Sequence, residues 1–170
     1  MATIKDPIIK KLYSNNIATT IQAIEEIAQS GNSGYIPMLV DVLYIHENDE
    51  VKMNIIKLLS EVKHSDAVVE LVKAIENEKY KPLQEVLIRA CWENGLDYSN
   101  YFTTFIDLLI NGEYMVAFEA FTLIENSDVK LTATSTKEYL DRLRGALSQA
   151  SDDRKILIHS IIQFLPSLIQ

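Results

Sequence analysis

The feature that most constrains the fold is a helical stripe of apolar residues that recurs along the whole chain. Apolar side chains stand at i, i+3, i+4 and i+7, the spacing that places them on one face of an α-helix. The alternating pattern of β-strands is almost absent. In the segment EVKMNIIKLLSEVKHSD the striped face consists of Ile55, Leu58, Leu59 and Val62. The sequence therefore predicts an all-α fold.

The striped helix resembles other helices of the same chain. We call its counterparts A helices, and their inward sets are Thr20, Ala23, Ile24 and Ile27; Leu87, Ala90, Cys91 and Asn94; Ala117, Ala120, Phe121 and Ile124; and Ile158, Ile161, Ile162 and Leu165. A second family, the B helices, alternates with them, with inward sets Ile36, Leu39, Val40 and Leu43; Val68, Leu71, Val72 and Ile75; Phe102, Phe105, Ile106 and Leu109; and Thr136, Tyr139, Leu140 and Leu143. The opposite face of the A helices carries polar residues, namely Gln22, Lys57, Arg89, Glu119 and Ser160, which supports the register.

Capping and turn residues divide the chain into helix pairs. Asp6-Pro7 predicts the start of a short helix over 6–14, Lys81-Pro82 the start of the third A helix, and Ser135 with Glu138 a capping box that opens the last B helix. The predicted repeats cover 16–47, 48–79, 81–111 and 113–149, and a final helix covers 152–166. Helix pairs of this length bury their apolar faces by stacking on their neighbours. We expect residues 1–170 to form a single α–α superhelix of about four and a half helix pairs.

The segment NDEVKMNIIKLLSEVKHSDAVVELVKAI resembles the HEAT repeat, especially the short type of phycobilisome lyases. It has an acidic residue, Val-Lys, paired small or apolar residues, and a short turn into a second helix. The Val51-Lys52 pair has weaker counterparts at Tyr114-Met115 and Asp153-Arg154. The resemblance implies a HEAT-like, armadillo-like solenoid that acts as a protein-interaction scaffold or adaptor without catalysis. Tetratricopeptide and armadillo-type solenoids fit the length too, although no Trp or Pro recurs at the tetratricopeptide spacing.

Charge and composition disfavour several classes of partner. The chain has 24 acidic and 16 basic residues, and its net charge of −8 disfavours nucleic acid and anionic membrane. No run reaches the roughly 18 apolar residues of a membrane span, and the opening MATIKDPIIKKLY lacks the apolar core of a signal peptide. The single cysteine cannot form an internal disulfide, so we expect a cytoplasmic protein.

No pattern predicts a catalytic, cofactor-binding or metal-binding residue. His46, His64 and His159 lie in different repeats, and the common phosphate-loop, acyl-transfer and zinc motifs are absent. Cys91 falls among inward apolar positions, which favours a packing role over a reactive one. The resemblance leaves an enzyme on the same scaffold as an alternative, either a bilin lyase or a DNA glycosylase for alkylated bases. The acidic balance argues against the glycosylase.

Two sets of outward residues are candidate partner-binding sites. Met38 and Ile45 place apolar side chains on the outward face of the first B helix, near Tyr35 and Tyr44. Trp92 stands in a column that is otherwise polar, so it is either covered by the loop 94–100 or exposed for a partner.

A charged column on the B helices is a third candidate. It consists of Asp41, Lys73, Asp107 and Asp141. On the inner surface of a HEAT-like stack these residues would form a mildly acidic stripe for a basic segment of another protein or peptide. A solvated helix face is the alternative.

The final segment, RKILIHSIIQFLPSLIQ, carries apolar residues on more than one face. Beyond the inward set it adds Ile156, Leu157, Phe164, Leu168 and Ile169. A terminal repeat normally turns a polar face to water. We therefore expect self-association or partner contact through this end, with a folded-back tail as the alternative.

Overall fold

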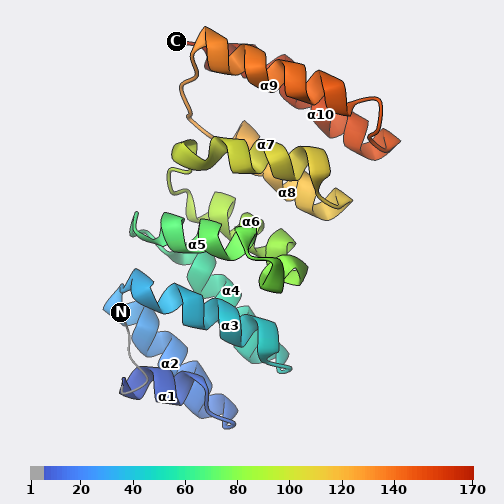
Figure 1. Ribbon diagram of the computed structural model, residues 1–170. Coiled ribbons are helices and arrows are strands. Elements are labelled where there is room, and N and C mark those ends of the chain that lie inside the picture. Colours follow the sequence, from blue (N-terminus) through green and yellow to red (C-terminus); the bar gives the residue numbers. More distant parts are fainter. Residues whose placement is uncertain (1–5) are drawn as a thin grey trace. The chain divides into compact units, whose positions relative to one another are not determined.

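The computed structural model describes residues 6–170 as helices joined by short turns (Figure 1). The chain divides into two compact units, one that ends at Leu96 and one that spans Asp97–Gln170. Within the described residues the regular elements are ten α-helices and four 3₁₀-helices, and no strand is present beyond a single bridge. The predicted all-α fold of stacked helix pairs is confirmed. The predicted single domain over 1–170 stays a prediction.

The first unit consists of two layers of helices. Its elements are α1 (Pro7–Leu12), α2 (Ile17–Ser30), η1 (Ser33–Tyr35), α3 (Ile36–Ile45), α4 (Asp49–Glu61), α5 (Ala67–Glu76), η2 (Glu78–Leu83) and α6 (Gln84–Asn94). Helices α2, α4 and α6 pack in series, and α3 packs beside α5 in the second layer (Figure 1). The A and B helices predicted from the sequence are therefore separate layers of this unit.

The second unit repeats the same construction. Its elements are η3 (Ser99–Tyr101), α7 (Phe102–Asn111), α8 (Tyr114–Glu125), α9 (Ala133–Ala146), α10 (Asp152–Phe164) and η4 (Leu165–Leu168). Helix α8 packs against α7 and α10, and α9 packs against the same two helices. Among described residues 6–170, no helix is long and apolar enough to cross a membrane.

The helix starts follow the capping chemistry, with two corrections. The Asp6 side chain accepts a hydrogen bond from the backbone N–H of Ile8 at 2.9 Å and caps α1, as predicted. The cap of α9 is Thr132, whose hydroxyl accepts from the N–H of Ser135 at 3.1 Å. Helix α9 begins at Ala133, so Ser135 is its third residue and not the cap. The hydroxyl of Ser135 accepts a hydrogen bond in return from the Thr132 N–H. Pro82 lies in η2, so α6 begins after it and not at it.

Most of the predicted inward residues form the core, but one outward prediction is wrong. Glu119 on α8 is only 2% exposed. Val116 and Leu123, which lie three residues before it and four after it, are buried on the same stripe of the helix. Helix α8 is therefore buried over two faces, which the single-stripe prediction did not allow.

Candidate functional site

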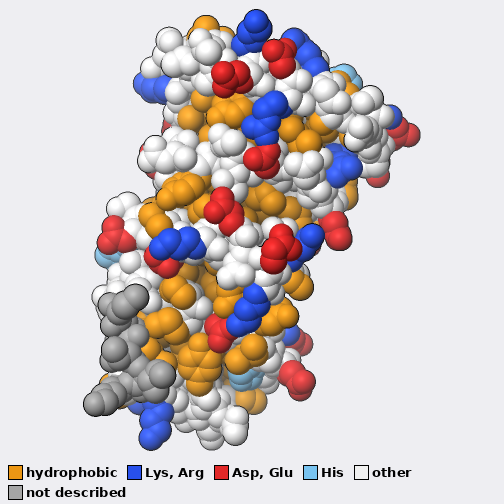
Figure 2. Space-filling model, in the orientation of Figure 1, with side chains coloured by type: hydrophobic (Ala, Val, Ile, Leu, Met, Phe, Trp, Pro, Cys, Tyr) orange, Lys and Arg blue, Asp and Glu red, His pale blue; other side chains and the backbone are white. Residues whose placement is uncertain are grey.

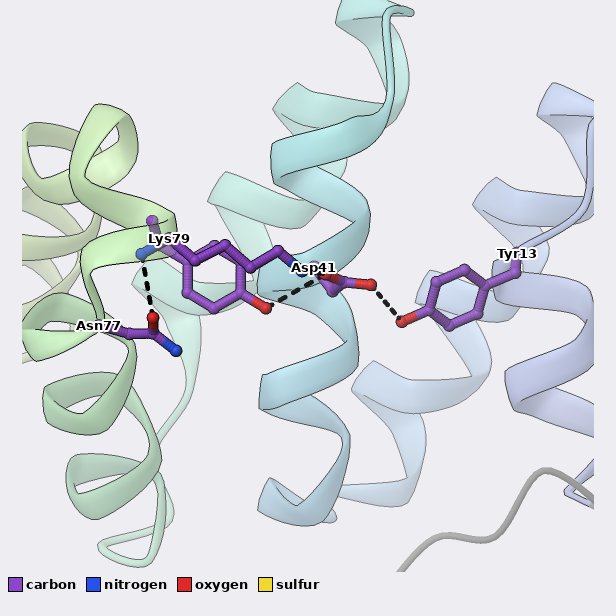
Figure 3. A network of polar contacts seen from close by, with 5 residues as sticks. Tyr13, Asp41, Asn77 and Lys79 are labelled. Atoms are coloured by element: carbon purple, nitrogen blue, oxygen red, sulfur yellow. Dashed lines mark hydrogen bonds and ion pairs between the residues drawn. The ribbon is translucent and has the colours of Figure 1, made fainter.

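A carboxylate in the first unit, that of Asp41 on α3, is bound by side chains from two other elements (Figure 3). Tyr13, which caps the C-terminus of α1, donates its hydroxyl to Oδ2 at 3.0 Å. Tyr80 in η2 donates its hydroxyl to Oδ1 at 3.1 Å, and the Nζ of Lys79 forms an ion pair with the same oxygen. The carboxylate thus links α1, α3 and η2.

The turn after α5 determines where Lys79 and Tyr80 lie. The side chain of Asn77 accepts a hydrogen bond from the Lys79 backbone N–H at 3.0 Å and starts η2 (Figure 3). At the other end, Nε2 of Gln84 donates to the carbonyl of Ile75 at 2.9 Å, near the C-terminus of α5. These two bonds hold η2 against α5, and η2 also packs against α3.

The electrostatics of the cluster favour charged Asp41 and charged Lys79. Burial alone would raise the pKa of Asp41, but hydrogen bonds from Lys79, Tyr13 and Tyr80 hold that pKa below its ordinary value. The pKa of Lys79 is raised, chiefly by its hydrogen bond to Asp41. Burial, followed by the hydrogen bond to Asp41, raises the pKa of Tyr13, so its hydroxyl remains a donor.

Two aromatic rings complete the surroundings of the Lys79 ammonium. Its Nζ lies 4.9 Å from the centroid of the Tyr80 ring and 5.7 Å from that of the Tyr44 ring. The two rings meet edge to face, with centroids 5.7 Å apart and planes at 75°. We call Tyr13, Asp41, Tyr44 and Tyr80 the tyrosine–aspartate cage. Its ring faces and carboxylate have the chemistry that binds a cation.

An apolar surface adjoins the cage. Its side chains are Tyr13, Ile17, Tyr44 and Ile45, which are 42%, 40%, 42% and 56% exposed, and we call them the α1–α3 patch. An open pocket of about 390 Å³ is lined by Tyr13, Ile17 and Ile45 among others. In Figure 2 hydrophobic side chains gather over α1 and α3, in the lower part of the view.

The sequence predicts a partner-binding surface around Met38 and Ile45 on α3, and its role in binding stays a prediction. Ile45 is exposed and Met38 is half-buried, both on the same helix as Asp41. Tyr35 does not belong to the surface, because it is 6% exposed and donates its hydroxyl to Asp6 at 2.6 Å.

Sequence reasoning missed four residues of the site, namely Tyr13, Ile17, Lys79 and Tyr80. Tyr13 lies at the end of α1 and the Lys79-Tyr80 pair lies in η2, outside the predicted A and B helices. A signal was present: Tyr13, Tyr44 and Tyr80 recur at spacings of 31 and 36 residues, close to the length of the repeats.

Each aspartate of the expected acidic stripe has a basic side chain within ion-pair distance. Besides Asp41, which pairs with Lys79, Asp107 on α7 forms an ion pair with Arg142 on α9. Nη1 of Arg144 lies 4.0 Å from Oδ1 of Asp141, about one helical turn along α9. Nζ of Lys73 lies 2.8 Å from Oε1 of Glu70. Exposed pairs of this kind contribute little and are screened by salt. A role of Asp107 or Asp141 in partner binding stays a prediction.

Trp92 and Cys91 lie on α6, outside the cage. Cys91 is fully buried, as the repeat register predicts, whereas Trp92 is half-buried. Partner binding by Trp92 stays a prediction. Within residues 6–170, no group of three or more His, Cys, Asp or Glu side chains is placed to hold a metal ion.

At the C-terminus the folded-back tail is the arrangement present. The backbone N–H of Leu131 donates to the carbonyl of Leu168 at 2.9 Å, and that of Gln170 donates to the carbonyl of Leu131 at 3.1 Å. Leu157, expected on an exposed surface, is 7% exposed and belongs to the core. Phe164 and Leu168 are half-buried, which leaves Ile156 as the most exposed of the four predicted residues at 66%.

Comparison with known families agrees with this architecture. A family model described as HEAT repeats matches residues 6–92, just over half of the chain, from the cap of α1 into α6. Comparison with curated proteins gave no match, and comparison with solved structures gave none. The matched segment includes the whole cage and the α1–α3 patch. The helix pairs, their two layers and this match together show that the chain belongs to the HEAT-repeat family.

Proposed function

We propose that this protein is a non-catalytic, cytoplasmic scaffold or adaptor whose α1–α3 patch docks a segment of another protein. HEAT repeats commonly serve as protein-interaction scaffolds, which gives the general class. The observation that carries the proposal is the group of exposed apolar side chains on α1, α2 and α3 around an open pocket of about 390 Å³.

The composition of the patch suits a docking surface. Two of its members are tyrosines, which offer a large apolar ring and a polar hydroxyl and are favoured as anchors at interfaces. Isolated apolar side chains are common on protein surfaces, but a cluster beside a pocket is characteristic of binding sites. Met38 is half-buried on α3 and extends the apolar character of that helix.

The patch is also held in place before any partner binds. The hydroxyl of Tyr13 is fixed by Asp41, and the ring of Tyr44 packs against that of Tyr80. Side chains that are already ordered lose less conformational entropy on binding. A partner segment therefore meets a surface of nearly fixed shape.

The charge state of Asp41 argues for binding over catalysis at this surface. A carboxyl group that acts as a general acid near neutral pH needs a raised pKa. The pKa of Asp41 is lowered, because three donors stabilise its charged form. This carboxylate is suited to holding a cation and not to transferring a proton.

The test compares two apolar-to-acidic substitutions in the first unit. Ile45→Asp places a charge in the patch, and Met53→Asp makes a similar change on α4 at a side chain that is 62% exposed and outside the pocket lining. Proteins captured by the wild type are identified, purified and titrated against each variant by calorimetry. We expect Ile45→Asp to weaken binding at least tenfold and Met53→Asp to leave it unchanged. Equal affinities for both variants would show that the patch is not the docking surface.

A further inference from the structure

The tyrosine–aspartate cage already contains a ligand, and that ligand is a lysine of the same chain. The Lys79 ammonium pairs with Asp41 and lies over the rings of Tyr44 and Tyr80. A carboxylate together with ring faces is a common way for proteins to bind organic cations. The internal occupant therefore indicates which chemistry the cage accepts.

The cage does not depend on Lys79 for its own geometry. Asp41 keeps hydroxyl donors on both carboxylate oxygens, from Tyr13 to Oδ2 and from Tyr80 to Oδ1. The Tyr44 and Tyr80 rings pack on each other, and Asn77 holds the start of η2 through the backbone. Removal of the Lys79 side chain would leave an anionic, aromatic site of the same shape.

Lys79 is also held loosely enough to be replaced. Its side chain is 48% exposed, and that of Asp41 is 25% exposed. An ion pair and a cation–π contact at such a position are weak and salt-sensitive, and together they correspond to a factor of about ten in occupancy. A second ammonium group that approaches from solvent can compete for the same carboxylate.

We propose that the cage is a binding site for a lysine side chain of a partner, and that this lysine displaces Lys79 from Asp41. The inference rests on the proposed function, because the lysine would belong to the segment that docks on the adjoining α1–α3 patch. Tyr13 and Tyr44 are shared by patch and cage, so an apolar residue and a lysine close together in one segment could occupy both. The net charge of −8 favours such a cationic partner.

The first experiment removes the internal ammonium group from the cage and uses a small probe. Wild type and Lys79→Met are titrated with N-acetyl-lysine N-methylamide, and binding is followed by NMR at the ring resonances of Tyr44 and Tyr80. Lys73→Met is the matched control, because Lys73 is an exposed lysine of the same unit that pairs with Glu70. We expect Lys79→Met to bind the probe about tenfold more tightly than the wild type, and Lys73→Met to bind it like the wild type.

The second experiment tests whether the cation and the carboxylate are responsible. The norleucine analogue of the probe keeps the aliphatic chain but lacks the ammonium group, and we expect it not to shift the resonances of the two rings. Asp41→Asn in the Lys79→Met background should return probe affinity to the wild-type level or below. Thermal unfolding of each variant shows that the fold is retained.

The outcomes separate this inference from the proposed function. Equal probe affinity for Lys79→Met and the wild type, or equal binding of the norleucine analogue, overturns the lysine site. Ile45→Asp should lose the partner protein but still bind the small probe in the Lys79→Met background. If Ile45→Asp loses the partner while Lys79→Met leaves the affinity for the probe unchanged, the docking surface is supported and the lysine-binding role of the cage is refuted.

Discussion

The two tyrosines that donate to Asp41 are not equivalent, and this leads to a quantitative prediction. Tyr13 is the only donor to Oδ2 among the described residues, whereas Oδ1 receives both Tyr80 and Lys79. Tyr13→Phe therefore leaves one carboxylate oxygen without a protein donor. Tyr80→Phe, the same chemical change, leaves Oδ1 with Lys79.

The magnitude follows from the exposure of the site. A hydrogen bond to a charged group contributes about 1.5–3 kcal/mol when it is well shielded from water. Tyr13 is 42% exposed, so water can replace part of the lost bond. We expect Tyr13→Phe to lower the free energy of unfolding by about 1 kcal/mol and Tyr80→Phe by about 0.5 kcal/mol or less. For a chain of this length, 1 kcal/mol corresponds to a decrease in Tm of about 2–4 °C.

The assay is urea and thermal unfolding at neutral pH, followed by far-UV circular dichroism. A third variant, Asp41→Ala, closes a double-mutant cycle, and in that background Tyr13→Phe should cost less than about 0.3 kcal/mol. A loss for Tyr80→Phe that equals or exceeds the loss for Tyr13→Phe would refute the reasoning from donor counts. So would an unchanged cost of Tyr13→Phe when Asp41 is absent.

Three further predictions concern pH, backbone strain and assembly. The hydrogen bond from Tyr35 lowers the pKa of Asp6 in the folded protein. The stabilising effect of this bond is therefore complete above the ordinary pKa of 3.8 and is lost as the pH falls through the lower folded pKa. Tyr35→Phe should move the midpoint of acid unfolding to higher pH. Gly31 and Gly95 have φ values of 61° and 64°, so alanine should cost about 1 kcal/mol at each position; urea midpoints unchanged from the wild type would contradict this strain. Because the C-terminal tail is folded back, we expect light scattering to give the mass of one chain at micromolar concentration, and the mass of a dimer would contradict this expectation.

The sequence alone determined the helices and their buried faces. The stripe that contains Ile55 and Leu59 predicts burial, and both are at most 1% exposed. The same register correctly assigned Cys91 to the core. This succeeds because the helical period of 3.6 residues decides which side chains share a face, and burial of that face is the dominant stabilising term. Repetition of the stripe also determined that the helices form stacked pairs.

Only the tertiary structure decided which side chains from different elements meet. Asp41 binds Tyr13 and Lys79, which lie 28 and 38 residues away in the chain, and no periodicity within one helix specifies such a contact. The burial of Glu119 and the folded-back C-terminal tail likewise depend on neighbours and not on the local pattern. A stripe fixes the face that a helix turns inward, but the polar residues at helix ends can reach several partners. Their choice depends on how adjacent helices pack, and here that packing places Lys79 of η2 beside Asp41 of α3.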